Sequence, residues 1–324
     1  MVFDTYWRFA AERLEMYYRR LRGEPAPWTS DSILKTYRFT NTYRVADRVS
    51  QYLIREVQYH PSRPRTSQEL FFRTLLFKVF NKIETWEALE RAHGPLTWKG
   101  VDLNGINKTL SGLRAHGHRI YSAAYIMPAP GFGAQWKHTN HLKLIGSMMT
   151  DRLSDRIRQA PDFASVYERV LQYPGLGRFL AYQYAIDLNY SELLDFSEDD
   201  FVVAGPGAID GISKCFASTG ALTPEEVIRW VADRQEQELS ARGIGFPGLF
   251  GRRLHLIDCQ NLFCEISKYA RVAHPNISGA ANRQKIKQSY KQDHKPLPEP
   301  MLPPRWRVHI PRAADHRIPQ LALL

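Results

Sequence analysis

The sequence predicts an all-α fold on three observations. Apolar residues recur every three to four positions along most of the 324 residues, as on the buried face of a helix. Stretches with the strict alternation of a β-strand are almost absent. The hydrophobic fraction of 44 % and the charged fraction of 24 % suit a globular protein with a core. After Pro275 periodicity is lost and the sequence becomes basic and proline-rich. We therefore expect one helical domain over residues 1–275 and a poorly ordered tail over 276–324.

Each helix is predicted from its own pattern. The first, over residues 1–20, repeats large apolar side chains from Phe3 to Tyr17 at helical spacing. The next covers 39–57 with Thr40 as N-cap. Residues 67–89 form the most hydrophobic run, so this helix is expected at the centre. Further helices are expected over these ranges: 101–117, 138–157, 163–172, 178–188, a segment after Gly207, 223–239 and 249–272. Thr223 caps the helix over 223–239, which has acidic residues in its first turn.

Charge and cysteine content limit the class of protein. Lys and Arg number 44 against 33 Asp and Glu, a net charge of +11 that favours an anionic partner such as nucleic acid. The three cysteines form no C-x-x-C pair, which argues against a disulfide framework or an iron–sulfur site. The N-terminus lacks the apolar segment of a signal peptide, and no run reaches the roughly 18–20 apolar residues of a membrane span. We expect a soluble intracellular protein, cytoplasmic or nuclear according to the host.

The stretch Tyr173–Asn189, YPGLGRFLAYQYAIDLN, combines a tight corner with a helix. Glycine lets the chain turn sharply and lets a phosphate approach the backbone, and the free N–H groups at a helix N-terminus favour an anion. The pattern predicts a DNA-binding helix–hairpin–helix near 162–188, with contacts from Gly175, Leu176, Gly177 and Arg178. A glycine cap between two ordinary helices is the alternative.

The segment that follows, DDFVVAGPGAIDG, resembles helix–hairpin–helix DNA glycosylases in its position. In that class a short extended piece after the hairpin carries the catalytic aspartate. Here Val202–Gly207 contains none, although Asp200 and Asp210 flank it. We assign Gly205, Gly207 and Lys214 to the DNA contact.

Several stretches together resemble one family. They are FTNTYRVADRVSQYLI, FFRTLLFKVFNKIETWE, YSAAYIM, YPGLGRFLAYQYAIDLNYSE, DFVVAGPGAIDGISKCF and DCQNLFCEISKYAR. From about Arg38 to Arg271 the chain resembles the α-glutamyl/putrescinyl thymine pyrophosphorylases and the helical domain of 5-hydroxymethyluracil DNA kinases. The resemblance implies a glycosylase-like helical fold that acts on a flipped thymine-derived base in DNA. It implies displacement of pyrophosphate from the pyrophosphorylated base by an amine or amino-acid co-substrate. The chain lacks the P-loop motif G-x-x-x-x-G-K-[ST], so a base kinase would be a separate partner.

Two helical faces supply the candidate catalytic residues. Asp258, Asn261 and Glu265 fall at i, i+3 and i+7 with Lys268 beyond them, and Asn41, Arg44 and Arg48 have the same spacing. A solvated charged face is the alternative for both sets. With the resemblance, we assign Asp258 or Glu265 as general base on the amine. Arg44, Arg48 and Lys268 would stabilise the departing pyrophosphate or bind the DNA phosphate.

No cofactor or metal is predicted. His138 and His141 are spaced to share a helix face, but a third ligand is missing from the sequence pattern.

The tail is a second candidate for DNA contact. Residues 283–312 contain eight Lys or Arg side chains against Asp293 and Glu299, a net charge of +6. Such a segment supplies sequence-independent affinity for DNA, or it serves as a solubilising or targeting extension. Two other functions stay open for the whole chain: a DNA glycosylase that uses Asp200 or Asp210, and a non-catalytic DNA-binding module that works with a separate kinase.

Overall fold

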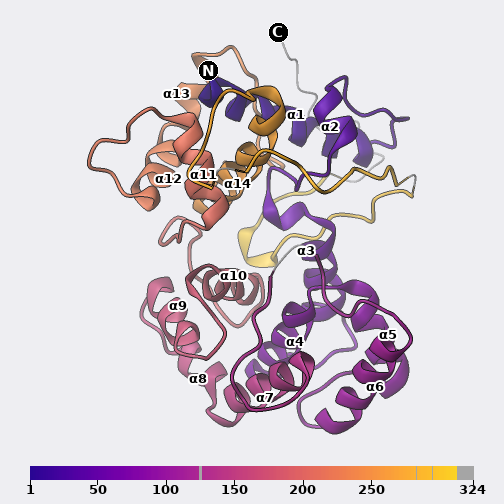
Figure 1. Ribbon diagram of the computed structural model, residues 1–324. Coiled ribbons are helices and arrows are strands. Elements are labelled where there is room, and N and C mark those ends of the chain that lie inside the picture. Colours follow the sequence, from indigo (N-terminus) through magenta and orange to yellow (C-terminus); the bar gives the residue numbers. More distant parts are fainter. Residues whose placement is uncertain (124–125, 282, 294, 312–324) are drawn as a thin grey trace. The chain divides into compact units, whose positions relative to one another are not determined.

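The computed structural model describes residues 1–123, 126–281, 283–293 and 295–311. It confirms the all-α prediction, because the described residues form helices and loops, with isolated β-bridges and no β-strand among them (Figure 1). No helix in this part of the chain has both the length and the apolar character that crossing a membrane demands.

The chain divides into two compact units. Unit 1 comprises the described residues of Met1–Asp47 and Phe201–Leu324, and unit 2 comprises Arg48–Asp200. The boundary predicted after residue 275 falls inside unit 1 and stays a prediction. The helices of unit 1 are α1 (Val2–Leu21), α2 (Ser32–Thr36), a 3-10 turn (Arg44–Ala46), α11 (Pro206–Cys215), α12 (Pro224–Asp233), α13 (Gln235–Ser240), α14 (Leu256–Ala273) and a 3-10 turn (Pro304–Trp306).

Unit 1 is built on the packing of α11 against α14. Gly211 of α11 lies so close to α14 that a Cβ atom would collide with the backbone carbonyl of Phe263. A Cβ atom on Gly207, one turn earlier, would come within 3.1 Å of the sulfur of Cys264. Small residues on α11 therefore let the two backbones approach, and α1 covers them with buried aromatic side chains such as Tyr6 and Trp7.

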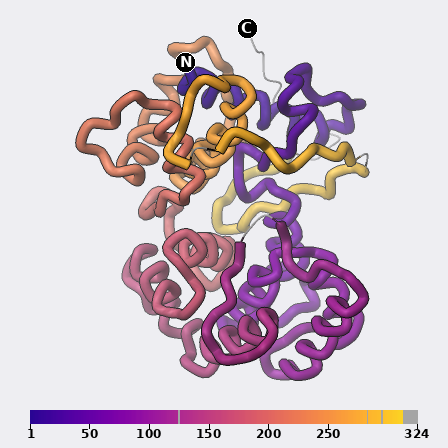
Figure 2. Tube along the Cα trace, viewed as in Figure 1, coloured from indigo at the N-terminus to yellow at the C-terminus, as the bar shows by residue number. Residues whose placement is uncertain are grey.

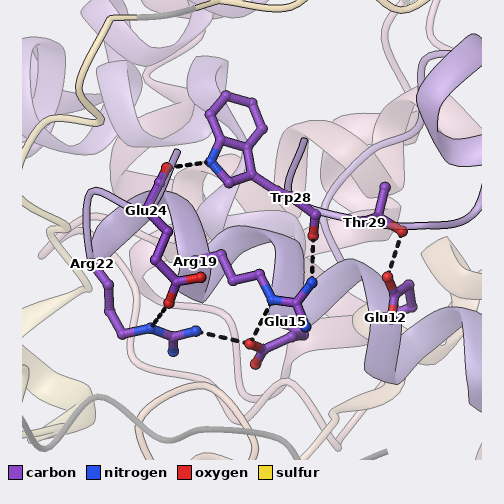
Figure 3. A network of polar contacts seen from close by, with 7 residues as sticks. All are labelled: Glu12, Glu15, Arg19, Arg22, Glu24, Trp28 and Thr29. Atoms are coloured by element: carbon purple, nitrogen blue, oxygen red, sulfur yellow. Dashed lines mark hydrogen bonds and ion pairs between the residues drawn. The ribbon is translucent and has the colours of Figure 1, made fainter. Parts of the chain in front are cut away.

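The loop after α1 is fixed by a polar network (Figure 3). Arg19 and Arg22 both bind Glu15, at 3.0 and 2.8 Å, and Glu15 is 3 % exposed. Arg19 also donates to the carbonyl of Trp28, while the indole N–H of Trp28 donates to the carbonyl of Glu24. The loop thus returns along α1 and leads into α2.

Unit 2 is organised around α4, as expected for the most hydrophobic run. Every residue of α4 from Glu69 to Phe80 is buried. Its Lys78 forms a buried ion pair of 2.7 Å with Asp187 of α10. The helices of this unit are α3 (Arg48–Tyr52), a π-helix (Leu53–Gln58), α4 (Ser67–Phe80), α5 (Ile83–His93), α6 (Leu103–Ala115), α7 (Lys137–Thr150), α8 (Leu153–Arg158), α9 (Phe163–Leu171) and α10 (Arg178–Asn189).

The predicted helix over 39–57 is wrong in its first half. Residues 38–43 are not helical, Thr40 is not an N-cap, and regular α-helix begins only at Arg48. The backbone N–H of Thr40 donates to Glu265, and that of Asn41 donates to the side chain of Asp47. Side chains that satisfy backbone groups in this way compete with helical hydrogen bonds. Asn41, Arg44 and Arg48 therefore do not share a helix face.

Three other predicted helices are each split in two. Asn81 (φ 48°) separates α4 from α5, and Arg152 (φ 52°) separates α7 from α8. Both adopt the left-handed conformation, which ends an α-helix. Arg234 lies between α12 and α13. The long helix expected over 249–272 starts only at Leu256.

The described part of the tail lies along unit 1 (Figure 2). Its backbone pairs with residues 36–38: the N–H of Arg38 donates to the carbonyl of Gln288, and that of Tyr290 donates to Thr36. Farther along, Leu302 is 7 % exposed, and the guanidinium of Arg252 stacks on the ring of Trp306 at 3.7 Å. Arg312 lies outside the described residues.

Candidate functional site

The polar face of α14 binds the loop over residues 40–47. Glu265 accepts the N–H of Thr40 at 3.0 Å and the ammonium of Lys268 at 2.8 Å. Asn261, one turn away, donates to the hydroxyl of Thr40 and to the carbonyl of Asn41. The predicted face of α14 is therefore real, and it holds a non-helical segment against the helix.

Asp258 has a capping role at the start of α14. One of its carboxylate oxygens accepts the N–H of His255 at 3.1 Å, which closes a capping box with the imidazole of His255. The other accepts the backbone N–H of Arg44 at 3.2 Å. With 3 % exposure and a backbone donor on each oxygen, Asp258 is suited to fixing the loop rather than to taking a proton from a substrate.

Asn41, Asp47 and Arg13 form the other side of this loop. Asn41 receives a 2.7 Å hydrogen bond from the guanidinium of Arg13, and its own amide donates to the carbonyl of Ala46. Asp47 accepts the N–H of Asn41 at 2.9 Å. We call Arg13, Asn41, Asp47, Glu265 and Lys268 the loop cluster.

Asp47 has a proton affinity well above that of an ordinary aspartate. Burial raises its pKa from 3.8 to about 6, and the charge of Glu265 adds to that, whereas the N–H of Asn41 and the charge of Arg13 act in the opposite direction. A carboxyl with a pKa near neutrality is a good general base, and such shifts gather at functional sites. The sequence placed Asp47 beside the two arginines but gave no sign that its carboxyl would be shielded from water.

The two arginines of the predicted pair differ in environment. Arg44 is 6 % exposed, in a 3-10 turn of unit 1. Arg48 begins α3 in unit 2, where its exposed guanidinium lies 3.8 Å from Glu84. Arg44 is connected to the loop cluster, because its carbonyl accepts the N–H of Asp47 at 3.2 Å and its charge acts on that carboxyl.

The predicted hairpin joins α9 to α10, which pack together. Gly175 has φ 80°, a conformation that favours glycine, and the side chain of Leu176 is buried, as expected. Gly177 is the N-cap of α10 and offers no side chain to cap the helix, while Arg178 is exposed in its first turn. This arrangement is what phosphate binding at a helix N-terminus requires.

The second set of predicted DNA contacts is mostly turned inward. Gly205, the N-cap of α11, is buried, and Gly207 packs on α14. Lys214 is 6 % exposed, and its ammonium binds Asp210 at 3.0 Å and the carbonyl of Ser267 at 2.9 Å. Contact between Lys214 and DNA would require this buried pair to open.

Asp210 is likewise committed inside unit 1. It is fully buried, and besides Lys214 it accepts the hydroxyl of Ser267 and the N–H of Ala281. These partners outweigh the effect of burial and hold its pKa below the ordinary value. It is therefore poorly placed to serve a glycosylase reaction. Asp200, the other candidate, is exposed at the end of unit 2.

His138 and His141 have partners within unit 2. His138 is bonded to the hydroxyl of Ser111, and His141 lies between the hydroxyl of Tyr121 and the carbonyl of Pro128. Burial lowers the pKa of both, to about 4 for His141. In the described ranges no three His, Cys, Asp or Glu side chains gather as a metal site would need.

Comparison with known proteins places these features in a family. A sequence model described as the helical domain of 5-hmdU DNA kinase matches residues 1–279. The chain belongs to this family. The match contains every residue assigned above to catalysis or to the hairpin and α11 contacts with DNA. It ends at residue 279, two residues before Ala281, whose N–H binds Asp210, and before the basic part of the tail.

A curated relative agrees with the family match. The 5-hmdU DNA kinase of Bacillus phage SP10 is 26 % identical over an alignment of 292 residues, which covers 83 % of this chain and 45 % of the relative. The chain thus spans less than half the length of that kinase. No solved structure matches it.

Proposed function

We propose that the chain acts in the hypermodification of a thymine-derived base in DNA, as the helical part that binds DNA carrying 5-hydroxymethyluracil or its pyrophosphorylated form. The observation that carries this proposal is the family match over residues 1–279, together with the relative's name. The uncapped N-terminus of α10 behind the glycine corner and the net charge of +11 agree with it.

The kinase step belongs elsewhere in this proposal. The 324 residues contain no P-loop motif, and the match covers only 45 % of the relative. The residues that bind the nucleotide phosphates would then lie in another segment or in a partner base kinase. For unit 2, which contains the hairpin, this favours the predicted alternative of a DNA-binding module that works with a separate kinase.

A chemical step at the loop cluster is the finer form of the proposal. An amine would attack the exocyclic methylene carbon of pyrophosphorylated hydroxymethyluracil, the carbon–oxygen bond would break, and pyrophosphate would leave with the electron pair. The surplus proton of the amine would pass to a carboxylate. Asp47, with its pKa near 6, suits this role better than the other two carboxylates. Both oxygens of Asp258 accept backbone N–H groups, and Glu265 binds the ammonium of Lys268 as well as the N–H of Thr40. Arg13 and Lys268 supply positive charge within the cluster.

The test is mass spectrometry of DNA nucleosides after reaction with hydroxymethyluracil DNA and with its pyrophosphorylated form, with a panel of amines. Amine-modified thymidine supports the transfer step. Abasic sites instead identify a glycosylase. Tight binding without any product supports the module that works with a kinase, and absence of DNA binding contradicts the proposal as a whole.

Asp47→Asn separates chemistry from binding in the same assay. The amide keeps an oxygen that can accept the N–H of Asn41 but cannot take a proton at neutral pH. We expect loss of product with unchanged DNA affinity, and wild-type activity that rises with pH through about 6. Arg8→Ala, at an exposed position on α1, is the matched control. Full activity of Asp47→Asn would remove Asp47 from the mechanism.

A further inference from the structure

The positive charge of the chain is concentrated in two stretches. Residues 283–312 have a net charge of +6. Residues 91–150 contain seven Lys or Arg side chains and one acidic residue, Asp102, which also gives +6. The remaining residues carry 29 basic and 30 acidic side chains, so the excess of the whole chain lies in these two stretches. The second of them belongs entirely to unit 2.

The cations of residues 91–150 are also unusual in their pairing. In the described structure none of the seven lies within ion-pair distance of a carboxylate, and all but Lys137 are exposed. They are Arg91, Lys99, Lys108, Arg114, Arg119, Lys137 and Lys143. Elsewhere in unit 2, carboxylate partners are found for Arg48, Arg55, Arg63, Arg65, Arg73, Lys78 and Arg152. Unpaired surface cations are available to an external anion.

Helices α6 and α7 bring four of these cations to one end of the unit. Three contacts join the helices in reverse order: Asn107 with Thr139, Ser111 with His138, and Arg114 with Trp136. The helices are therefore antiparallel, and the C-terminus of α6 lies beside the N-terminus of α7. Arg114, Arg119 and Lys137 occur at this end, and the ammonium of Lys143 reaches the carbonyl of Phe132 in the connecting loop.

Trp136 gives this end an aromatic surface. Its indole is 45 % exposed, and the guanidinium of Arg114 stacks on it at 4.4 Å. A stacked guanidinium keeps its N–H edges free for phosphate oxygens, and an exposed indole stacks on nucleobases. The ammonium of Lys137 likewise lies over an aromatic ring, 4.4 Å from the centre of Tyr121. We call Arg114, Arg119, Trp136, Lys137 and Lys143 the α6–α7 cluster.

The connecting loop also touches the glycine corner. A Cβ atom on Gly175 would come within 3.1 Å of Pro130 in this loop, so the two segments are in direct contact. The corner at the N-terminus of α10 and the α6–α7 cluster thus border the same loop within unit 2. A polyanion bound at one would pass close to the other.

We propose that the α6–α7 cluster binds the backbone of DNA next to an unpaired base, which stacks on Trp136. The inference rests on the proposed function in that it takes DNA as the partner. Unpaired bases are the expected occupant because an aromatic side chain can stack only on a base that has left the duplex stack. An enzyme that modifies a base in duplex DNA must expose such a base.

The charge part of the proposal is tested with Arg114→Ala/Arg119→Ala. Arg156→Ala/Arg158→Ala on α8 removes the same charge from exposed positions of unit 2 and is the matched control. Fluorescence anisotropy with a labelled single strand at 50 to 200 mM salt measures affinity and salt dependence. In the test variant, we expect log K to fall less steeply with log salt. The magnitude of the slope should decrease by about 1.4, which is about 0.7 for each phosphate that is no longer neutralised. Equal slopes for the test and control variants would overturn the proposal.

The stacking part is tested with Trp136→Ala against Trp136→Phe. Alanine should weaken binding to a single strand about 5-fold or more, phenylalanine should restore most of it, and a fully paired duplex should respond little. Equal loss on duplex and single strand would overturn the stacking role. Circular dichroism melting checks that each variant is folded. Failure of the wild-type protein to bind DNA defeats the proposed function, whereas binding that both variants leave unchanged defeats only this inference.

Discussion

At the scale of single residues, the raised pKa of Asp47 predicts how the stability of the fold depends on pH. Its pKa is raised from 3.8 to about 6, so the folded state holds this proton more tightly than the unfolded chain. The stabilising effect of the bound proton is present below about pH 4 and is lost as the pH rises through about 6. At pH 7 the charged carboxylate therefore destabilises the fold, and Asp47→Asn should stabilise it by about 1–3 kcal/mol.

Thermal melting of both proteins between pH 4 and pH 8 measures this effect. The difference in Tm should be largest above pH 6 and vanish near pH 4. A variant less stable than wild type at pH 7 would mean that the attraction between Arg13 and the charged carboxylate outweighs the cost of removing that carboxylate from water. Increased stability combined with lost activity would be typical of a functional carboxyl kept at the expense of the fold.

Sequence reasoning was only partly sufficient at this scale. Spacing predicted correctly that Asp258 and Glu265 share a side of α14. It did not identify their partners, which are backbone N–H groups of Arg44 and Thr40 more than 200 residues away. Helical periodicity reports which side chains lie together, but the segment that packs on them depends on tertiary structure. For the same reason the partial burial that raises the pKa of Asp47 could not be predicted from the sequence.

At the scale of elements, the α11–α14 contact depends on Gly211. A Cβ atom there would collide with the carbonyl of Phe263, so one helix must move. We expect Gly211→Ala to destabilise the protein by about 1–3 kcal/mol or more. Gly112→Ala in α6 is the control, because no atom lies within 4 Å of the new methyl group and alanine favours a helix. Chemical denaturation compares them, and equal stabilities would contradict the close packing of α11 on α14.

Helix existence was easier to predict than helix ends. The helices α1, α6, α9 and α10 form close to where their patterns place them, and Thr223 caps α12 in a full capping box. The breaks at Asn81 and Arg152 were missed, because a left-handed residue inside an apolar repeat leaves the repeat intact. The non-helical loop at 38–43 was missed because its stabilising carboxylates come from elsewhere, including α14.

At the scale of the whole molecule, charge is distributed unevenly. The tail and residues 91–150 hold the entire positive excess, yet only the tail stood out in the sequence, because its charges occur without apolar periodicity. In residues 91–150 the cations are diluted by the apolar positions of α6 and α7, and the signal is the near absence of acidic residues. A count of acidic residues along the chain would have found this stretch.

The tail can now be tested separately from the α6–α7 cluster. Deletion of residues 283–324 removes the tail's charge and also its backbone pairing with residues 36–38. A full-length variant in which Lys285, Lys287, Lys291 and Lys295 are all changed to Gln removes four exposed charges and keeps that pairing.

If the tail contacts phosphates, both variants should bind DNA more weakly. The affinity should also depend less steeply on salt, with the magnitude of the slope reduced by about 1 for each phosphate that is no longer bound. Loss of affinity in the deletion alone would show that the tail acts by stabilising unit 1, and wild-type slopes in both would exclude the tail from the DNA interface.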